Sequence, residues 1–326
     1  MAAPISIEHA FALILRECKR SAISHVALAD SFGCVLAADV AADRDWPPFN
    51  RSMVDGYAVF SGDTRSAPDV LEVIEDVPAG KSATKALSPG QAIRIMTGAP
   101  VPAGADCVIM QERTDIPKPG YVRFLMTMKS GQNVAKRAED AAAGAVVIAA
   151  GTRIGAAETG VLAAVGITQV AVRAVPRVAV LGTGDEVVEP HETPGPAQIR
   201  NSNSYQLLAQ CATQRFPAHY LGIAPDDRAK TRELIESGFQ SDVLVSTGGV
   251  SVGEHDHVGA SFKELGVQIF FDKVAIKPGK PTTFGTRNGT IVFGLPGNPV
   301  AAYVCFHLFV MTAIRQRMGA ADPLPR

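Results

Sequence analysis

The chain has 326 residues, of which 47% are hydrophobic and 19% charged, a composition typical of a globular protein with two or three domains and a large buried core. Its formal net charge of −1 gives no electrostatic basis for binding nucleic acid or an anionic membrane, and an aromatic content of 6% argues against base-stacking surfaces. The five cysteines are widely spaced and form no CxxC pair, which predicts reduced, mostly buried thiols in a cytoplasmic protein.

The beginning of the chain predicts an amphipathic helix over residues 6–20, with apolar side chains at helical spacing and Ser6 as its N-cap. An apolar extended stretch follows over residues 25–40. Residues 141–175 return to alanine-rich helix and strand patterns. We therefore expect residues 1–45 and 141–175 to form one helical and extended domain.

Residues 46–140 differ in sequence pattern from the segments on either side. They contain short β-like runs separated by proline and glycine, among them "DGYAVF", "VLEVIEDV" and "QAIRIMTG". Such runs predict a small all-β domain, inserted into the first domain.

Residues 176–326 alternate between strand and helix patterns. The expected strands are "RVAVLG", "AHYLGI", "DVLVST", "QIFF" and "TIVFGL". This alternation predicts a mostly parallel sheet with helices on both faces, a three-layer α/β/α domain within a multidomain α/β protein. The apolar run at 300–314 is too short to span a membrane and is expected to be a buried packing helix.

Acidic side chains recur in the loops that follow these strands, where ligands bind in open α/β sheets. Glu186, Asp226 and Asp256 stand in three such loops. Clustered carboxylates repel one another unless a cation lies between them, and oxygen ligands favour Mg²⁺ over zinc. A Gly-Gly pair can equally be a simple turn, and Asp226 and Asp227 can cap a helix. Four strand-end loops have unusual compositions of this kind, which favours the functional interpretation; they are "TGDE", "APDD", "TGGVSVGEHD" and "LPGNP".

The segment "DKVAIKPGKP" supplies Lys273, Lys277 and Lys280, which predict binding of a phosphate or an oxyanion unless they form only a solvated face. Gly248 and Gly249 would let backbone N–H groups approach that anion. His255 and His257 are expected to be solvated rather than zinc ligands. The sequence contains neither a G-x-G-x-x-G nor a Walker motif, so no dinucleotide or P-loop site is indicated.

Six stretches, in this order, resemble the molybdopterin molybdenumtransferases, the molybdenum insertases of molybdenum-cofactor synthesis, a family that includes the C-terminal part of gephyrin. They are "PPFNRSMVDGYAV", "IRIMTGAPVPAGADCVIMQE", "TGDEV", "STGGVSVGEHD", "AIKPGKPTTFG" and "GLPGNPV". The resemblance extends from the N-terminal helix to about residue 317.

This resemblance implies an elongated homodimer whose active site lies between the α/β domain of one subunit and the first two domains of the other. It implies a Mg²⁺-dependent reaction that hydrolyses adenylyl-molybdopterin, inserts molybdate into the dithiolene and releases AMP. The molybdopterin adenylyltransferase is a candidate protein partner. We expect the apolar faces of residues 6–20 and 155–165 to pack across the two-fold axis.

The resemblance, together with the strand-end chemistry, designates two sets of site residues. The candidate catalytic residues are Asp55, Thr97, Asp140, Glu186, Asp226 and Asp256, of which the last three are also the candidate metal ligands. The candidate cofactor-binding residues are Ser246, Gly248, Gly249, Ser251, Lys273, Lys277, Lys280, Pro296 and Pro299.

The chain departs from the family pattern in places. "NPVAA" stands where the family usually reads "NPVSA", so Ala301 removes a hydroxyl. The family usually continues after the position of residue 317 into a further small β domain, and without that domain we expect weaker molybdate insertion. Two other functions fit parts of the sequence. A molybdopterin adenylyltransferase resembles residues 176–317 but leaves residues 1–175 unexplained. A non-enzymatic scaffold would not need Asp226, Asp256, Lys273 and Lys277.

Overall fold

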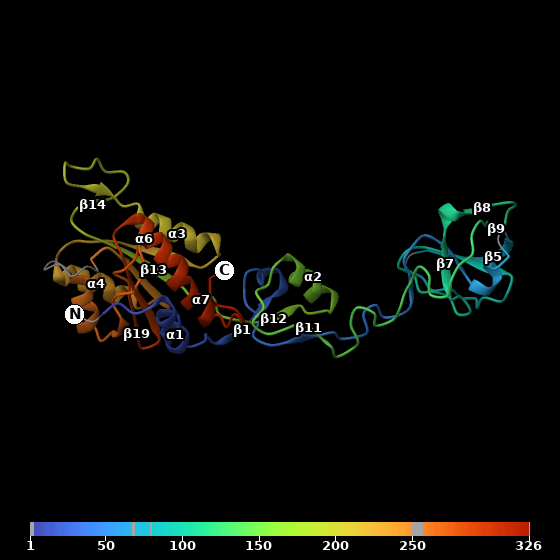
Figure 1. Cartoon of the computed structure of the whole chain (residues 1–326), viewed down its shortest axis with the longest axis horizontal. Helices are drawn as coiled ribbons and strands as arrows, with labels where there is room; N and C mark the ends of the chain where they lie inside the picture. The colour runs from blue at the N-terminus through green and yellow to red at the C-terminus, as the bar shows by residue number, and fades with distance from the viewer. Residues whose placement is uncertain (1–2, 67–68, 79, 250–256, 326) are drawn as a thin grey trace. The chain divides into compact units, whose positions relative to one another are not determined.

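The structure is a computed structural model that describes residues 3–66, 69–78, 80–249 and 257–325 (Figure 1). The chain forms two compact units, one made of Met1–Asp39 and Ile148–Arg326, the other of Val40–Val147. Both contain sheets and the larger also contains the α-helices, so the expected mixed α/β fold is confirmed. Among the described residues, none of the helices is both long and apolar enough to cross a membrane.

The larger unit is built on a six-stranded sheet in the order β16-β13-β17-β20-β19-β18. The first four strands run parallel, and β19 is antiparallel to both of its neighbours. The strands are β13 (Val178–Thr183), β16 (Ala218–Ala224), β17 (Val243–Thr247), β18 (Gln268–Phe271), β19 (Thr283–Arg287) and β20 (Thr290–Leu295). β13, β17 and β20 are buried along their whole length, as expected for parallel strands covered on both faces.

Helices cover both faces of this sheet, which gives three layers. Along β13, Val178 and Val180 face one core while Ala179 and Leu181 face the other, the period of two that a strand imposes. The first core contains side chains from α1 (Ile7–Glu17), α3 (Asn203–Thr213), α6 (Pro299–Cys305) and α7 (Met311–Arg317). The second contains side chains from α4 (Arg228–Gly238) and α5 (His257–Glu264).

The N-terminal helix begins as predicted but packs differently. The Ser6 hydroxyl accepts a hydrogen bond from the His9 N–H at 3.1 Å, which confirms the N-cap. The apolar face of α1 is buried in the core of its own chain, next to α7, with 5.6 Å between the ring centroids of Phe11 and Phe309 (Figure 1). The expectation that this face packs across a two-fold axis is wrong, because helices from the other end of the chain already cover it.

The segment after Pro299 is the buried helix that the sequence predicts. α6 continues through a π-helical turn, Phe306–Val310, into α7, and the inward side chains are fully buried. All five cysteines are free and buried, as expected, and burial raises the pKa of Cys211 to about 12.

A further part of the larger unit contains α2 (Ala156–Ala164). In it, β1 (Ile23–Ala27) pairs antiparallel with β12 (Gln169–Arg173), which joins the two distant segments of this unit.

The smaller unit holds a second six-stranded sheet, in the order β7-β4-β6-β5-β9-β8, with an apolar core on each face. Its strands are β4 (Gly56–Val59), β5 (Asp69–Val77), β6 (Gln91–Ile95), β7 (Cys107–Met110), β8 (Thr114–Asp115) and β9 (Tyr121–Phe124). Two short two-stranded sheets lie outside this sheet. One pairs β3 (Arg51–Ser52) with β10 (Val134–Ala135), and the other pairs β2 (Val40–Ala41) with β11 (Val146–Ile148).

Phe309→Ala tests the packing of α1 and the π-helical turn on the sheet. Phe309 is fully buried between Phe11 and Phe271, so its truncation should lower the free energy of unfolding of the larger unit by about 3–5 kcal/mol. Tyr303, which is 46% exposed on the same helical segment, is the matched control. Tyr303→Ala should change the free energy of unfolding by about 0.5 kcal/mol or less. Urea unfolding followed by circular dichroism measures both, and similar losses in the two variants would contradict the packing.

Candidate functional site

The candidate site lies where the order of the strands reverses. From β13 the chain passes to β16 on one side, then crosses back to β17 on the other. Connections that diverge in this way leave a crevice at the carboxyl ends of the strands. A pocket occurs there, which we call the crevice, lined by Gly182, Thr183, Glu186, Val187, Ile199, Arg200, Asn201, Ser202, Asn203, Thr247, Gly248, Gly297 and Pro299.

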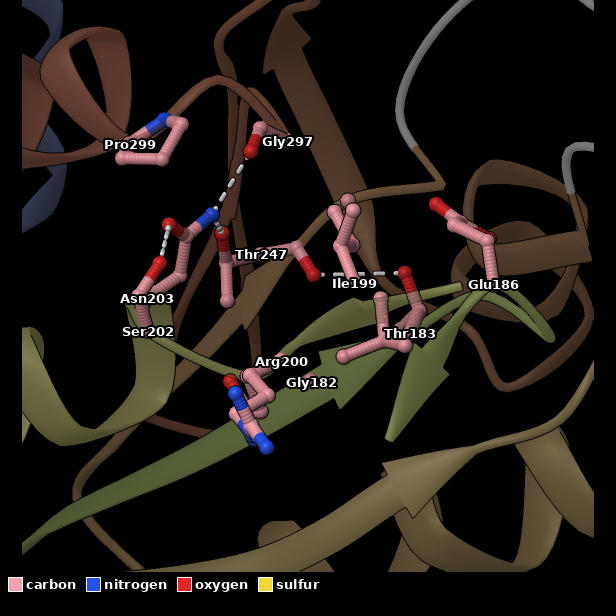
Figure 2. Close-up of a pocket in the computed structure, with 13 residues that line it drawn as sticks. Gly182, Thr183, Glu186, Ile199, Arg200, Ser202, Asn203, Thr247, Gly297 and Pro299 are labelled. Atoms are coloured by element: carbon pink, nitrogen blue, oxygen red, sulfur yellow. Dashed lines mark hydrogen bonds between the residues drawn. The ribbon is translucent and has the colours of Figure 1, made fainter. Parts of the chain in front are cut away.

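Asn203, the first residue of α3, joins the loops that form the crevice (Figure 2). Its Nδ2 donates to Thr247 Oγ1 at 2.9 Å and to the Gly297 carbonyl at 2.8 Å. The Thr247 hydroxyl in turn donates to the Pro296 carbonyl at 3.2 Å. The start of α3 is thereby held to the ends of β17 and β20. Asn203 was not among the residues expected from the sequence, although the dense polar run "RNSNSY" before a helix was a signal for it.

The two glycines after β17 are required by packing. Gly248 and Gly249 have φ angles of +89° and +61°, which favour glycine. A Cβ on Gly248 would lie 2.7 Å from Thr183 Oγ1, and one on Gly249 would lie 2.8 Å from Val258 Cγ2. The Gly248 N–H donates to the Leu295 carbonyl at 3.1 Å and so joins the ends of β17 and β20. Binding of an anion near the two glycines stays a prediction.

The acidic residues lie in neighbouring loops. Glu186 lines the crevice, and Asp226, after β16, donates its N–H to Asp185 Oδ1 at 2.9 Å, which links the loops after β13 and β16. Asp227 caps α4 by accepting from the Lys230 N–H, and this hydrogen bond lowers the pKa of the Asp227 carboxyl. Capping is thus the role of Asp227.

Two other expected site residues of this region, Ser251 and Asp256, lie outside the described residues, as does His255, which was expected to be solvated. Within the part of the chain that the structure describes, no three His, Cys, Asp or Glu side chains gather closely enough to hold a metal ion. The expected metal ligands therefore remain a prediction.

The lysines lie on the connection between β18 and β19, residues 272–282. Because β18 and β20 run in the same direction, this connection starts at the same edge of the sheet as the crevice. It packs against α6, since a Cβ on Gly279 would lie 2.4 Å from Cys305 Sγ. Lys277 and Lys280 are exposed and Lys273 half-buried, and none of the three lines the crevice.

The remaining candidates of the larger unit have mainly structural contacts. The Ser246 hydroxyl is buried and donates to the Phe293 carbonyl at 3.4 Å. Pro299 lines the crevice as the first residue of α6, whose N-cap Asn298 accepts from the Ala301 N–H at 3.1 Å. The Ala301 side chain is 3% exposed, so the family's serine would carry its hydroxyl at a buried position.

In the smaller unit the structure brings two predicted residues together. Both the N–H and the hydroxyl of Thr97 donate to Asp55 Oδ1 at 2.7 Å, and these hydrogen bonds lower the pKa of the Asp55 carboxyl. Only glycine fits at position 56, next to Asp55, because a Cβ there would lie 1.8 Å from the Ile109 carbonyl oxygen. Asp140 lies in a separate turn, exposed, and donates its N–H to the Trp46 carbonyl at 2.9 Å.

The lining of the crevice has a definite chemical character. Hydroxyl and amide groups from Thr183, Ser202 and Asn203 stand with the carboxylate of Glu186 and the guanidinium of Arg200, and its lining includes no His or Cys among the described residues. Oxygen ligands of this kind suit a hard cation, and the donors suit phosphate or other oxyanions. The lining of the crevice is therefore suited to a polar ligand that carries negative charge.

Comparisons with known proteins cover nearly the whole chain. Residues 5–166 match the family described as MoeA N-terminal region (domain I and II), and residues 179–316 match the probable molybdopterin binding domain. The first match includes most of the segment that an adenylyltransferase leaves unexplained.

Relatives and solved structures agree with these matches. A molybdopterin molybdenumtransferase of Bacillus subtilis is 38% identical over 320 residues, covering 96% of this chain and 74% of the relative. A Nostoc enzyme of the same name is 39% identical over 297 residues, covering 89% of this chain and 68% of the relative. The crystal structure of a molybdopterin biosynthesis moeA protein from Pyrococcus horikoshii has a TM-score of 0.81 at 32% identity, covering 98% of this chain and 81% of that one. The chain therefore belongs to the molybdopterin molybdenumtransferase family of molybdenum-cofactor biosynthesis enzymes.

Proposed function

We propose that the protein hydrolyses adenylyl-molybdopterin, inserts molybdate into the dithiolene of the pterin and releases AMP, in the cytoplasm and with Mg²⁺. The observation that carries this proposal is the crevice at the strand reversal, where a carboxylate stands beside hydroxyl, amide and guanidinium groups. A site of this composition, in a chain of this family, suits a substrate that joins a pterin to a nucleotide through phosphates.

The crevice would bind the phosphate region of the substrate. Asn203 starts α3 at the wall of the crevice, so the positive end of the helix dipole favours an anion there. The guanidinium of Arg200 and the lysines of residues 272–282 add positive charge at the same edge of the sheet. These groups bind and orient phosphate or molybdate, which reduces the entropic part of the barrier.

Mg²⁺ fits the oxygen donors of the crevice. Glu186 would hold the cation together with Asp226 and Asp256 from the neighbouring strand-end loops. When bound, Mg²⁺ neutralises charge on the phosphate oxygens.

The other candidates complete the proposal. Asp55 is held by Thr97 in its ionised form, and we assign this pair and Asp140 to catalysis. The protein acts as a homodimer, and a molybdopterin adenylyltransferase supplies its substrate. The dimer contact uses surfaces other than the apolar face of α1, which the chain buries itself.

AMP release tests this function directly. Purified protein incubated with adenylyl-molybdopterin and molybdate should release AMP only when Mg²⁺ is added, as measured by liquid chromatography. AMP formation no faster than in a protein-free control would refute the proposal.

Glu186→Gln tests the acidic side of the crevice. The substitution keeps the size of the side chain and removes its charge, so AMP release should fall about 10- to 100-fold, the effect of losing about 1.5–3 kcal/mol of charge-assisted interaction. Glu233→Gln, on the exposed face of α4, should leave the rate unchanged. An unaltered rate in Glu186→Gln, measured at subsaturating Mg²⁺, would remove Glu186 from the site.

Lys273→Ala and Lys277→Ala test the lysines on the connection between β18 and β19. Each should weaken the binding of substrate or molybdate by about 1.5–3 kcal/mol if the lysine makes a charge-assisted contact. Lys263→Ala, in the last turn of α5, is the control for a general loss of positive charge. Calorimetry measures all three, and affinities equal to those of the control for both ligands would show that neither lysine binds substrate or molybdate.

A further inference from the structure

Between β13 and α3 the chain leaves the sheet and returns over residues 184–202, which we call the excursion. Its regular structure is β14 (Val187–Val188), paired parallel with β15 (Ile199–Arg200). Both strands belong to the excursion, so their pairing does not attach it to the main sheet. The excursion nevertheless brings Glu186, Arg200 and Asn201 to the crevice, and contacts outside this pair must fix its position.

A carboxylate and a phenol provide such contacts. Glu189, directly after β14, accepts from the Tyr220 hydroxyl at 2.7 Å through Oε1. Tyr220 lies on β16, a strand of the main sheet, and its hydroxyl also receives the Asn201 Nδ2 donor at 2.7 Å. One phenol of the sheet therefore holds the outgoing and the returning ends of the excursion.

The hydrogen bonds leave each group a single arrangement. An ionised carboxylate only accepts, so Tyr220 donates its one proton to Glu189 and can only accept from Asn201. This orients the amide, whose Oδ1 accepts from the Ser204 N–H of α3 at 3.1 Å. Asn201 is 4% exposed, so water does not readily replace these partners. Burial and the neighbouring Glu189 raise the pKa of Tyr220, which keeps the phenol protonated at neutral pH.

We propose that Glu189, Tyr220 and Asn201 form a positioning bracket that holds Glu186 and the wall of the crevice in place for the reaction. Tyr220 and Glu189 do not line the crevice, so they act through the residues they hold. This inference rests on the proposed function, in which Glu186 takes part in holding Mg²⁺. Without the bracket, Glu186 would occupy a wider range of positions, and the cation would bind more weakly at an unchanged maximal rate.

Tyr220→Phe removes the shared hydroxyl and keeps the ring, whose centroid lies 5.8 Å from that of Tyr205. We expect amide hydrogen exchange across residues 184–202 to rise about tenfold, with β13 and β17 unchanged. The Mg²⁺ concentration for half-maximal AMP release should rise about tenfold, while kcat at saturating Mg²⁺ stays within about threefold. A variant that was merely less folded would lose kcat and keep the same half-saturation.

Tyr205→Phe is the matched control. The Tyr205 hydroxyl also donates to Glu189, at 3.0 Å to Oε2, but it does not contact Asn201 at the returning end of the excursion, which Tyr220 holds. Loss of the Tyr205 hydroxyl should therefore change the hydrogen exchange and the half-saturating Mg²⁺ concentration by less than about twofold. Glu189→Gln keeps one acceptor oxygen and should give a smaller change in the same direction as Tyr220→Phe.

Unchanged exchange and half-saturation in Tyr220→Phe would overturn the bracket, as would equal effects of Tyr220→Phe and Tyr205→Phe. If the parent protein releases no AMP, the proposed function fails, and the exchange measurement still decides whether the bracket fixes the excursion. If Tyr220→Phe does not fold, Glu189→Gln provides the same comparison.

Discussion

The parallel pairing of β13 with β16 on one side and β17 on the other is the constraint on which the candidate site depends. From β16 the chain crosses β13 through α4 on one face of the sheet to reach β17, so the connections that follow β13 and β17 diverge at the carboxyl ends of these two strands. The strands themselves contribute little chemistry, because β13, β17 and β20 are buried throughout and mainly apolar. They place polar loops of different origin at one edge of a rigid sheet, where hydrogen bonds between the loops can then fix them.

Those hydrogen bonds explain why the crevice is defined by residues outside the recognisable motifs. Asn203 holds the ends of β17 and β20, and Gly248 permits the close approach of the chain to Thr183. A buried polar group that loses its partner costs more than its hydrogen bond contributes, so such networks resist small displacements. Their rigidity suits a site that has to align phosphates, a carboxylate and an oxyanion. The same argument applies to Tyr220, which holds the excursion from outside the crevice.

Sequence patterns predicted the elements whose cause is local. β13, β17 and β20 could be predicted because strands covered on both faces are continuously hydrophobic. The Ser6 cap could be predicted because capping acts within one turn of the helix.

The elements and contacts that could not be predicted depend on distant partners. β19 was missed because "TFGTR" is short and carries a glycine and polar residues, and its strand conformation comes from pairing with β20. The amphipathic pattern of α1 indicated a buried face but not what buries it. Asn203 and Tyr220 were missed because their partners lie more than ten residues away in sequence, which no local pattern records.

We propose that the pterin nucleotide reacts in the crevice at the ends of β13 and β17. A crystal structure of the protein with adenylyl-molybdopterin and Mg²⁺ tests it most directly. Our account predicts that the phosphates of the ligand lie between Thr183, Asn203 and Gly297, with the cation near Glu186. A ligand bound at any other surface, with only water in the crevice, would contradict it.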